Sequence, residues 1–108
     1  MTEAEYEAVA IPELKALVRA LDALETPDME AELASDILTL EFNDGARFVV
    51  NSHRAARQIW MAAELTAWHF DWVAAKNAWI ASKSGEELWA VLERALSRHL
   101  KRPVTLAR

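Results

Sequence analysis

The sequence predicts an α+β fold, a two-layer sandwich in which two helices pack on one face of a mainly antiparallel sheet of about six strands. Three observations predict it. Apolar residues follow helical spacing near both ends of the chain, they alternate with polar residues in short segments between, and the loops there are too short for crossover connections. With 108 residues, of which 53% are hydrophobic and 27% charged, the chain is expected to form one globular domain over residues 1–108.

A first helix is predicted from Thr2 to just before Thr26-Pro27. Thr2 and Glu5 fit a capping box, in which each side chain bonds the backbone N–H of the other residue. The apolar residues that follow lie on one helical face: Tyr6, Ala10, Leu14, Leu17, Leu21 and Leu24. Pro12 lies inside this segment, and we expect a kink there because proline removes one hydrogen bond and clashes with the preceding turn.

About six short strands are predicted after this helix. Met29, Ala31 and Leu33 alternate with acidic residues, which is the period of a strand with one buried face. The segment Asn43-Asp44-Gly45 predicts a hairpin turn, because glycine accepts a positive φ. The further strands are expected near residues 37–42, 47–51, 58–63, 68–72 and 78–82.

A second helix is predicted before Pro103. A second capping box is expected at Ser84-Gly85-Glu86-Glu87. The apolar face of the helix comprises Leu88, Leu92, Ala95, Leu96 and His99. Because both helices are amphipathic, both are expected to cover the apolar face of the sheet, which leaves the other face in water.

Charge is distributed unevenly along the chain. Residues 1–44 contain twelve acids and two bases, whereas residues 45–108 contain five acids and ten bases. An acidic surface repels phosphate backbones, so we expect no nucleic-acid partner and favour cations or a basic protein. No apolar run approaches the roughly 20 residues of a membrane span and no leader segment is visible, so we expect no membrane association and a cytoplasmic location. The absence of cysteine excludes disulfides and thiolate metal sites.

A series of short motifs follows in a specific order along the chain. They are Ile37-Leu38-Thr39-Leu40-Glu41-Phe42 before Asp44-Gly45, then Asn51, Gln58-Ile59-Trp60, His69-Phe70-Asp71, Trp79, and Ser84-Gly85-Glu86 with Trp89. This series resembles the frataxin family, most closely its bacterial CyaY-type members, over essentially the whole chain. The resemblance implies weak binding of iron (Fe²⁺ or Fe³⁺), a role in iron–sulfur cluster assembly, and contact with the cysteine desulfurase and the scaffold protein, whose complex it would modulate.

The resemblance also implies an acidic, metal-binding ridge on the first helix and first strand. Carried over residue by residue, the ridge comprises Glu3, Glu7, Asp22, Glu25, Asp28, Glu30 and Glu32. Carboxylate oxygens suit hard cations, and surface carboxylates would supply one or two ligands each, with water in the other positions. We therefore expect weak and poorly selective iron binding. Ile11, Val18 and Arg19 interrupt the ridge where family members often carry acids, so fewer ions are expected than on a fully acidic relative.

A partner-binding surface is expected on the uncovered face of the sheet. Strand alternation turns Gln58 and Trp60 to this face, and the resemblance places Asn51 and His69 beside them. An exposed tryptophan is a typical interface anchor. For each of two residues an alternative to partner binding stays open. Trp60 could instead be partly buried by its neighbours, and His69 could be an ordinary surface residue. The remaining histidines, His53 and His99, indicate no function.

Three functions stay open at this point. The leading hypothesis is a non-enzymatic, monomeric iron-binding regulator that docks on a basic surface of the desulfurase complex. The second is a pure interaction module with incidental metal binding. The third is a ferroxidase or iron-storage protein, in which iron would promote oligomers. The sequence contains no Glu-x-x-His pair and only two glycines, Gly45 and Gly85, so we expect no enzyme and assign no catalytic residue.

Overall fold

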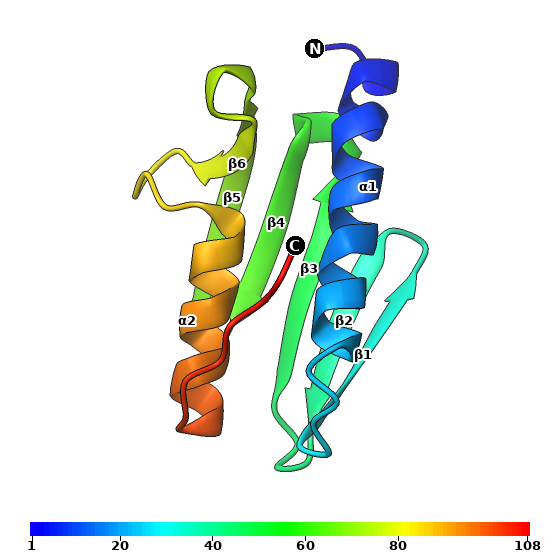
Figure 1. Cartoon of the computed structure of the whole chain (residues 1–108). Coiled ribbons are helices and arrows are strands. Elements are labelled where there is room, and N and C mark those ends of the chain that lie inside the picture. The colour runs from blue at the N-terminus through cyan, green and yellow to red at the C-terminus, as the bar shows by residue number, and fades with distance from the viewer.

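The element order is the predicted one, a helix, six strands and a helix (Figure 1). A computed structural model describes residues 1–108. Its helices are α1 (Glu3–Asp22) and α2 (Leu88–Leu100), and its strands are β1 (Met29–Ala34), β2 (Ile37–Phe42), β3 (Arg47–His53), β4 (Gln58–Ala63), β5 (Thr66–Val73) and β6 (Ala78–Ala81). Single turns of 3₁₀-helix, η1 (Arg54–Ala56) and η2 (Ala74–Lys76), join β3 to β4 and β5 to β6. Each strand pairs antiparallel with the next, in the order β1-β2-β3-β4-β5-β6, so the predicted α+β sandwich is confirmed.

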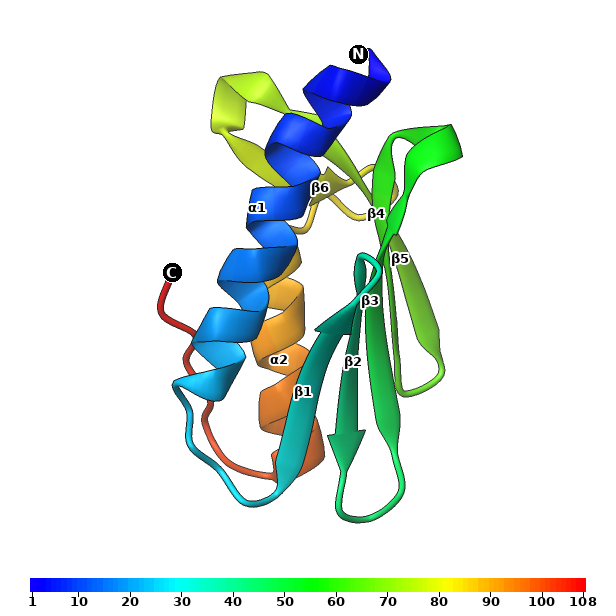
Figure 2. The same cartoon turned by 90° about the vertical axis from the view of Figure 1, so that its right-hand side faces the viewer.

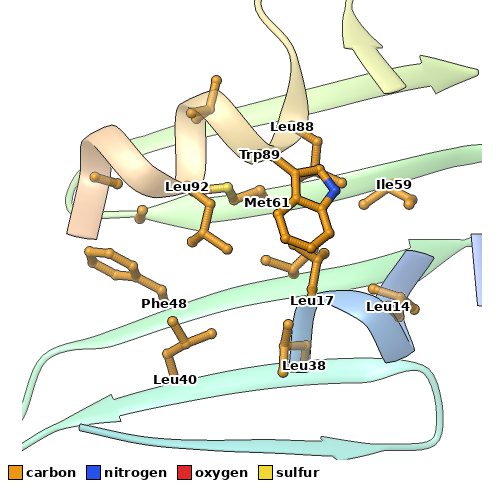
Figure 3. Close-up of a cluster of buried hydrophobic side chains, with 14 of the residues drawn as sticks. Leu14, Leu17, Leu38, Leu40, Phe48, Ile59, Met61, Leu88, Trp89 and Leu92 are labelled. Carbon is orange, nitrogen blue, oxygen red and sulfur yellow. The ribbon is translucent and has the colours of Figure 1, made fainter. Parts of the chain in front are cut away.

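Both helices lie on the same face of the sheet (Figure 2). Between the two layers, 25 buried residues form one hydrophobic core, and none of them is charged. Figure 3 shows part of this core, with Leu14, Leu17, Leu88, Trp89 and Leu92 from the helices over Leu38, Leu40, Phe48, Ile59 and Met61 from the strands. Burying each large side chain contributes roughly 1.5–3 kcal/mol. Neither helix is both long and apolar enough to span a bilayer.

The start of α1 confirms the predicted capping box. The Thr2 hydroxyl accepts a hydrogen bond from the Glu5 N–H at 3.1 Å, and the Glu5 carboxylate accepts one from the Thr2 N–H at 2.7 Å. The second hydrogen bond lowers the pKa of the Glu5 carboxyl. Pro12 is exposed and does not interrupt the helix, which continues to Asp22.

The predicted position of the second helix cap is wrong. Glu87, not Ser84, caps α2, because its carboxylate accepts the N–H groups of Trp89 at 2.9 Å and Ala90 at 3.2 Å. The preceding residues cannot be helical, since their backbone is bonded back to the end of β6. The Gly85 N–H donates to a β6 carbonyl at 2.7 Å, and Gly85 itself has a φ of +74°. The Ser84 hydroxyl accepts an N–H within this turn.

Tyr6 joins the first turns of α1 to the sheet, where β3 ends and β4 begins. Its side chain is fully buried, and its hydroxyl donates to the Gln58 carbonyl oxygen at 2.7 Å and lies 2.7 Å from the Ser52 hydroxyl. Its ring also packs edge-on against Trp79, with ring centres 5.9 Å apart. Burial raises the pKa of the Tyr6 hydroxyl, because the phenolate would lose its hydration.

The segment after α2 turns back and lies against both helices (Figure 1). Leu106 is buried, and its N–H donates to the Glu93 carboxylate at 2.7 Å. The Arg108 guanidinium lies 2.9 Å from the Glu13 carboxylate of α1 and 4.8 Å from the ring centre of Trp89 in α2. These contacts tie the two helices together through the end of the chain.

Shortening Leu106 tests whether the C-terminal segment contributes to stability. We expect Leu106→Ala to lower the free energy of unfolding by about 2 kcal/mol, because it removes buried methyl groups from the contact between the helices. Leu65→Ala is the matched control, since Leu65 is fully exposed and should change stability by less than about 0.5 kcal/mol. Urea unfolding of both variants measures the difference. Equal stabilities would show that the segment is not packed as described.

The titration of Tyr6 can be observed directly, because it is the only tyrosine. We expect tyrosinate absorbance to appear only at a pH above the ordinary value of about 10 in the folded protein, and near that value in guanidinium. The sign follows from linkage. Because the folded state holds this proton more tightly, stability is fully present below the unfolded pKa and is lost as the pH rises through the folded pKa. The same titration curve in both solvents would contradict the burial of Tyr6.

Candidate metal-binding edge and partner-binding face

The seven carboxylates of the predicted ridge lie on α1, on the loop after it and on β1. The structure places them in three settings. Glu3 and Glu7 lie beside Arg54, and Asp28 lies beside Arg102. The other four, Asp22, Glu25, Glu30 and Glu32, are exposed and make no ion pair.

Arg54 in η1 neutralises the N-terminal end of the ridge. One guanidinium nitrogen lies 2.6 Å from Glu7 and 3.9 Å from Glu3, and another lies 2.6 Å from Asp36 in the β1–β2 turn. The hydrogen bond to Asp36 is the main cause that raises the pKa of Arg54, and the carboxylate of Glu7 adds to it. A cation of the chain itself therefore lies between these three carboxylates.

Asp28 is also engaged within the molecule. Its carboxylate lies 2.8 Å from the Arg102 guanidinium, which follows α2, and accepts the Thr26 hydroxyl at 3.1 Å. Arg102 donates a further hydrogen bond to that hydroxyl at 2.9 Å. Asp28 thus links the end of α2 to the loop between α1 and β1. Its carboxylate is therefore not one of the free acids of the ridge.

The free acids gather at the outer edge of the sheet, where α1 ends and β1 begins. They line an open hollow of about 360 Å³ together with the apolar side chains of Leu21 and Met29. We name this set, Asp22, Glu25, Glu30 and Glu32, the acidic edge. Nowhere in the chain do three or more His, Asp or Glu side chains form a group arranged to hold a metal ion. The metal-binding role of the acidic edge, and of the ridge as a whole, stays a prediction.

The uncovered face of the sheet is organised around Trp60. Its partners across the strands are Asn51 in β3 and His69 in β5, the two residues that the resemblance places beside it. The half-buried indole is stacked between two imidazoles, that of His53 at 3.8 Å and 15° and that of His69 at 4.1 Å and 11°. Both faces of the indole are thus covered by side chains of neighbouring strands, so its partial burial, one of the two alternatives, is what the structure shows.

Gln58 holds the orientation of this stack. Its side-chain oxygen accepts the Trp60 indole N–H at 2.8 Å, and its side-chain nitrogen donates to the Asp71 carboxylate at 2.9 Å. The polar atom of the indole is therefore satisfied within the molecule. The result is a rigid aromatic platform on an open sheet, which suits an interface because little side-chain entropy is lost on docking. The partner-binding role of Asn51, Gln58, Trp60 and His69 stays a prediction.

Two residues of these surfaces were missed from the sequence. The sequence indicates no function for His53, yet it lies on the same face of β3 as Asn51. Its position two residues after Asn51 could have predicted this, because side chains alternate along a strand. The sequence pattern does not point to Arg54 either. No periodicity could have found it, because its carboxylate partners on α1 lie about 50 residues earlier in the chain.

Comparison with known proteins identifies the family. Residues 1–102 match the model of the frataxin-like domain. An iron-sulfur cluster assembly protein CyaY of Ralstonia nicotianae is 34% identical over 98% of this chain and 95% of its own length, and one of Tolumonas auensis is 33% identical over 98% and 99%. The frataxin from Psychromonas ingrahamii superposes over the whole of both chains with a TM-score of 0.89 at 22% identity. Trimeric frataxin from Saccharomyces cerevisiae, complexed with ferrous iron, covers 87% of each chain with a TM-score of 0.75 at 25% identity.

Replacing Arg54 tests whether it competes with metal ions. In the native chain we expect Mn²⁺ to broaden amide resonances near the acidic edge only. In Arg54→Gln, broadening should extend to Glu3, Glu7 and Asp36, because their charge is no longer balanced. An NMR titration of labelled protein measures this.

Lys76→Gln is the control for this titration, since it removes one positive charge from an exposed side chain that makes no ion pair. Broadening at Glu3 and Glu7 in the native chain, or the same pattern in both variants, would rule out competition by Arg54.

Proposed function

Because this chain belongs to the frataxin family, we propose that it acts in iron–sulfur cluster assembly, where it binds iron weakly on the acidic edge and modulates the complex of cysteine desulfurase and scaffold protein. The names of its CyaY relatives support the assembly role. The observation that carries the rest is the acidic edge itself, four exposed carboxylates without internal partners at one border of the sheet.

Iron is cargo in this proposal. Carboxylate oxygens accept Fe²⁺ and Fe³⁺, and the remaining coordination positions would hold water. Such an open set of ligands binds weakly and releases its ion readily, which suits transfer to another protein. Mn²⁺, Co²⁺ and Ca²⁺ would compete for the same oxygens. The ferrous complex of yeast frataxin supports iron as the ion of this family.

The partner docks through two surfaces in this proposal. The acidic edge attracts a basic surface of the desulfurase complex, which mainly raises the rate of association and is weakened by salt. The Trp60 platform then supplies shape and contact area, with Asn51 and the Gln58 amide as polar groups beside it. Docking itself changes the activity of the partner, so the proposal assigns no catalytic residue to this chain. It places the protein in the cytoplasm as a monomer.

A specific observation favours a second function, a pure interaction module. Arg54 and Arg102 engage three of the seven ridge carboxylates, which leaves fewer of them for metal ions. In that case the acidic edge would serve docking alone.

One two-step NMR titration separates these functions. Labelled protein receives Fe²⁺ without oxygen and then the desulfurase with its scaffold. We expect iron to perturb the acidic edge and the partner to perturb both the edge and the residues around Trp60. The double variant Glu30→Gln, Glu32→Gln should weaken both steps, because it removes half of the free charge. The control Asp44→Asn, Glu64→Gln removes the same charge from two exposed turns that do not line the hollow of the acidic edge.

The outcomes are distinct. Weaker partner binding in the edge variant, together with no iron shifts in the native chain, would favour the interaction module. Absence of iron shifts in the native chain would reject the metal-binding part of the proposal. Partner binding that is unchanged by a severalfold increase in ionic strength would reject charged docking.

A further inference from the structure

Part of β5 has no neighbouring strand on one side. β5 covers Thr66–Val73, but the short strand β6 pairs only with its last four residues, Phe70 to Val73. After Ala81 the chain leaves the sheet and turns toward α2 (Figure 1). Ala67 and His69 are exposed at this point. The first half of β5 therefore presents unpaired backbone groups at the border of the sheet, which is the type of edge to which an extended segment can add as a strand.

A hollow of about 420 Å³ lies beside this free edge, between β5 and the loop that leads to α2. Its apolar wall includes the half-buried Trp68. The polar side chains that line it are Gln58, His69, Ser82, Lys83 and Ser84. The amide of Gln58 is already bonded to Asp71 and Trp60, whereas the Lys83 ammonium and the two serine hydroxyls can donate to a ligand. The hollow thus combines an open strand edge with a group of donors.

The hollow contains no carboxylate. Acids make up 17 of the 108 residues, and each of the four other main hollows on the surface is lined by at least one of them. The two acids next along the same strand and loop already have partners, Asp71 in the amide of Gln58, which lines the hollow, and Glu86 in Arg94. Lys83 makes no ion pair and is exposed. The electrostatics of this hollow therefore favour a negative ligand, the opposite of the acidic edge.

We propose that the free edge of β5 and this hollow bind an extended acidic segment of a partner protein, which adds as a strand beside Ala67–His69 and places a carboxylate at Lys83. Backbone hydrogen bonds would supply affinity, and Lys83 with the hydroxyls of Ser82 and Ser84 would select a carboxylate. His69 connects the two surfaces, because it lines the hollow and also stacks on Trp60. The inference does not depend on iron binding at the acidic edge.

A model peptide tests the site on the full chain. The probe is acetyl-Glu-Val-Glu-Val-Glu-amide, titrated into labelled protein by NMR. We expect shifts and slower amide exchange confined to residues 66–69 and 82–84. Two control peptides should each bind about 5-fold or more weakly. The first has lysine in place of glutamate and loses the charge attraction. The second is the original peptide with alternate backbone nitrogens methylated, and it loses the strand hydrogen bonds.

Two lysine variants form a matched pair. Lys83→Glu should weaken binding of the acidic peptide about 5-fold or more, and Lys76→Glu, an exposed lysine in η2 outside the hollow, by less than about 2-fold. Any of four results would overturn the proposal: equal effects of the two variants, shifts elsewhere on the surface, equally tight binding of the methylated peptide, or equally tight binding of free glutamate. Such a result would leave iron binding at the acidic edge untouched, so the two proposals fail separately.

Discussion

Burial of one face of a six-stranded sheet by two helices is the constraint on which the other features depend. Side chains on β2 to β5 alternate, so each residue buried beneath the helices turns its neighbour toward solvent. Leu38, Val50, Ile59 and Phe70 are fully buried, one on each of these strands. A slip of one residue in any of these pairings would expose this apolar set, so the register is strongly specified. The row of polar and aromatic side chains around Trp60 exists because the opposite row is buried.

Ion pairs within the chain neutralise part of its negative surface. The chain has more acids than bases, and two arginines, Arg54 and Arg108, each lie between two or more carboxylates. Arg54 holds the start of α1 to the turn before β2, and Arg102 holds the end of α2 to the loop before β1. These pairs stabilise the borders of the sandwich modestly, because they are partly exposed. They also divide the negative surface, so that only one part keeps its full charge.

The sequence predicted the element order, the sheet type and the residues of the open face, because periods of 3.6 and 2 are local signals and the turns are short. It could not predict what depends on distant partners. The ion pairs of Arg54 join segments that only the fold brings together. The start of α2 was displaced by three residues, since the backbone before Glu87 is hydrogen-bonded to β6 instead of to the helix. His53 became part of the aromatic stack through cross-strand register.

The order of the strands has a consequence for how the chain folds. Each strand lies next to its neighbour in sequence, so every pairing closes a short loop, and the entropy lost in each closure is small. The sheet can therefore grow by successive hairpins. The contacts of Tyr6 differ, because they join residues 46 and 52 positions apart. Docking of the start of α1 therefore requires β3 and β4 to be paired first, and it closes a much longer loop than any hairpin of the sheet.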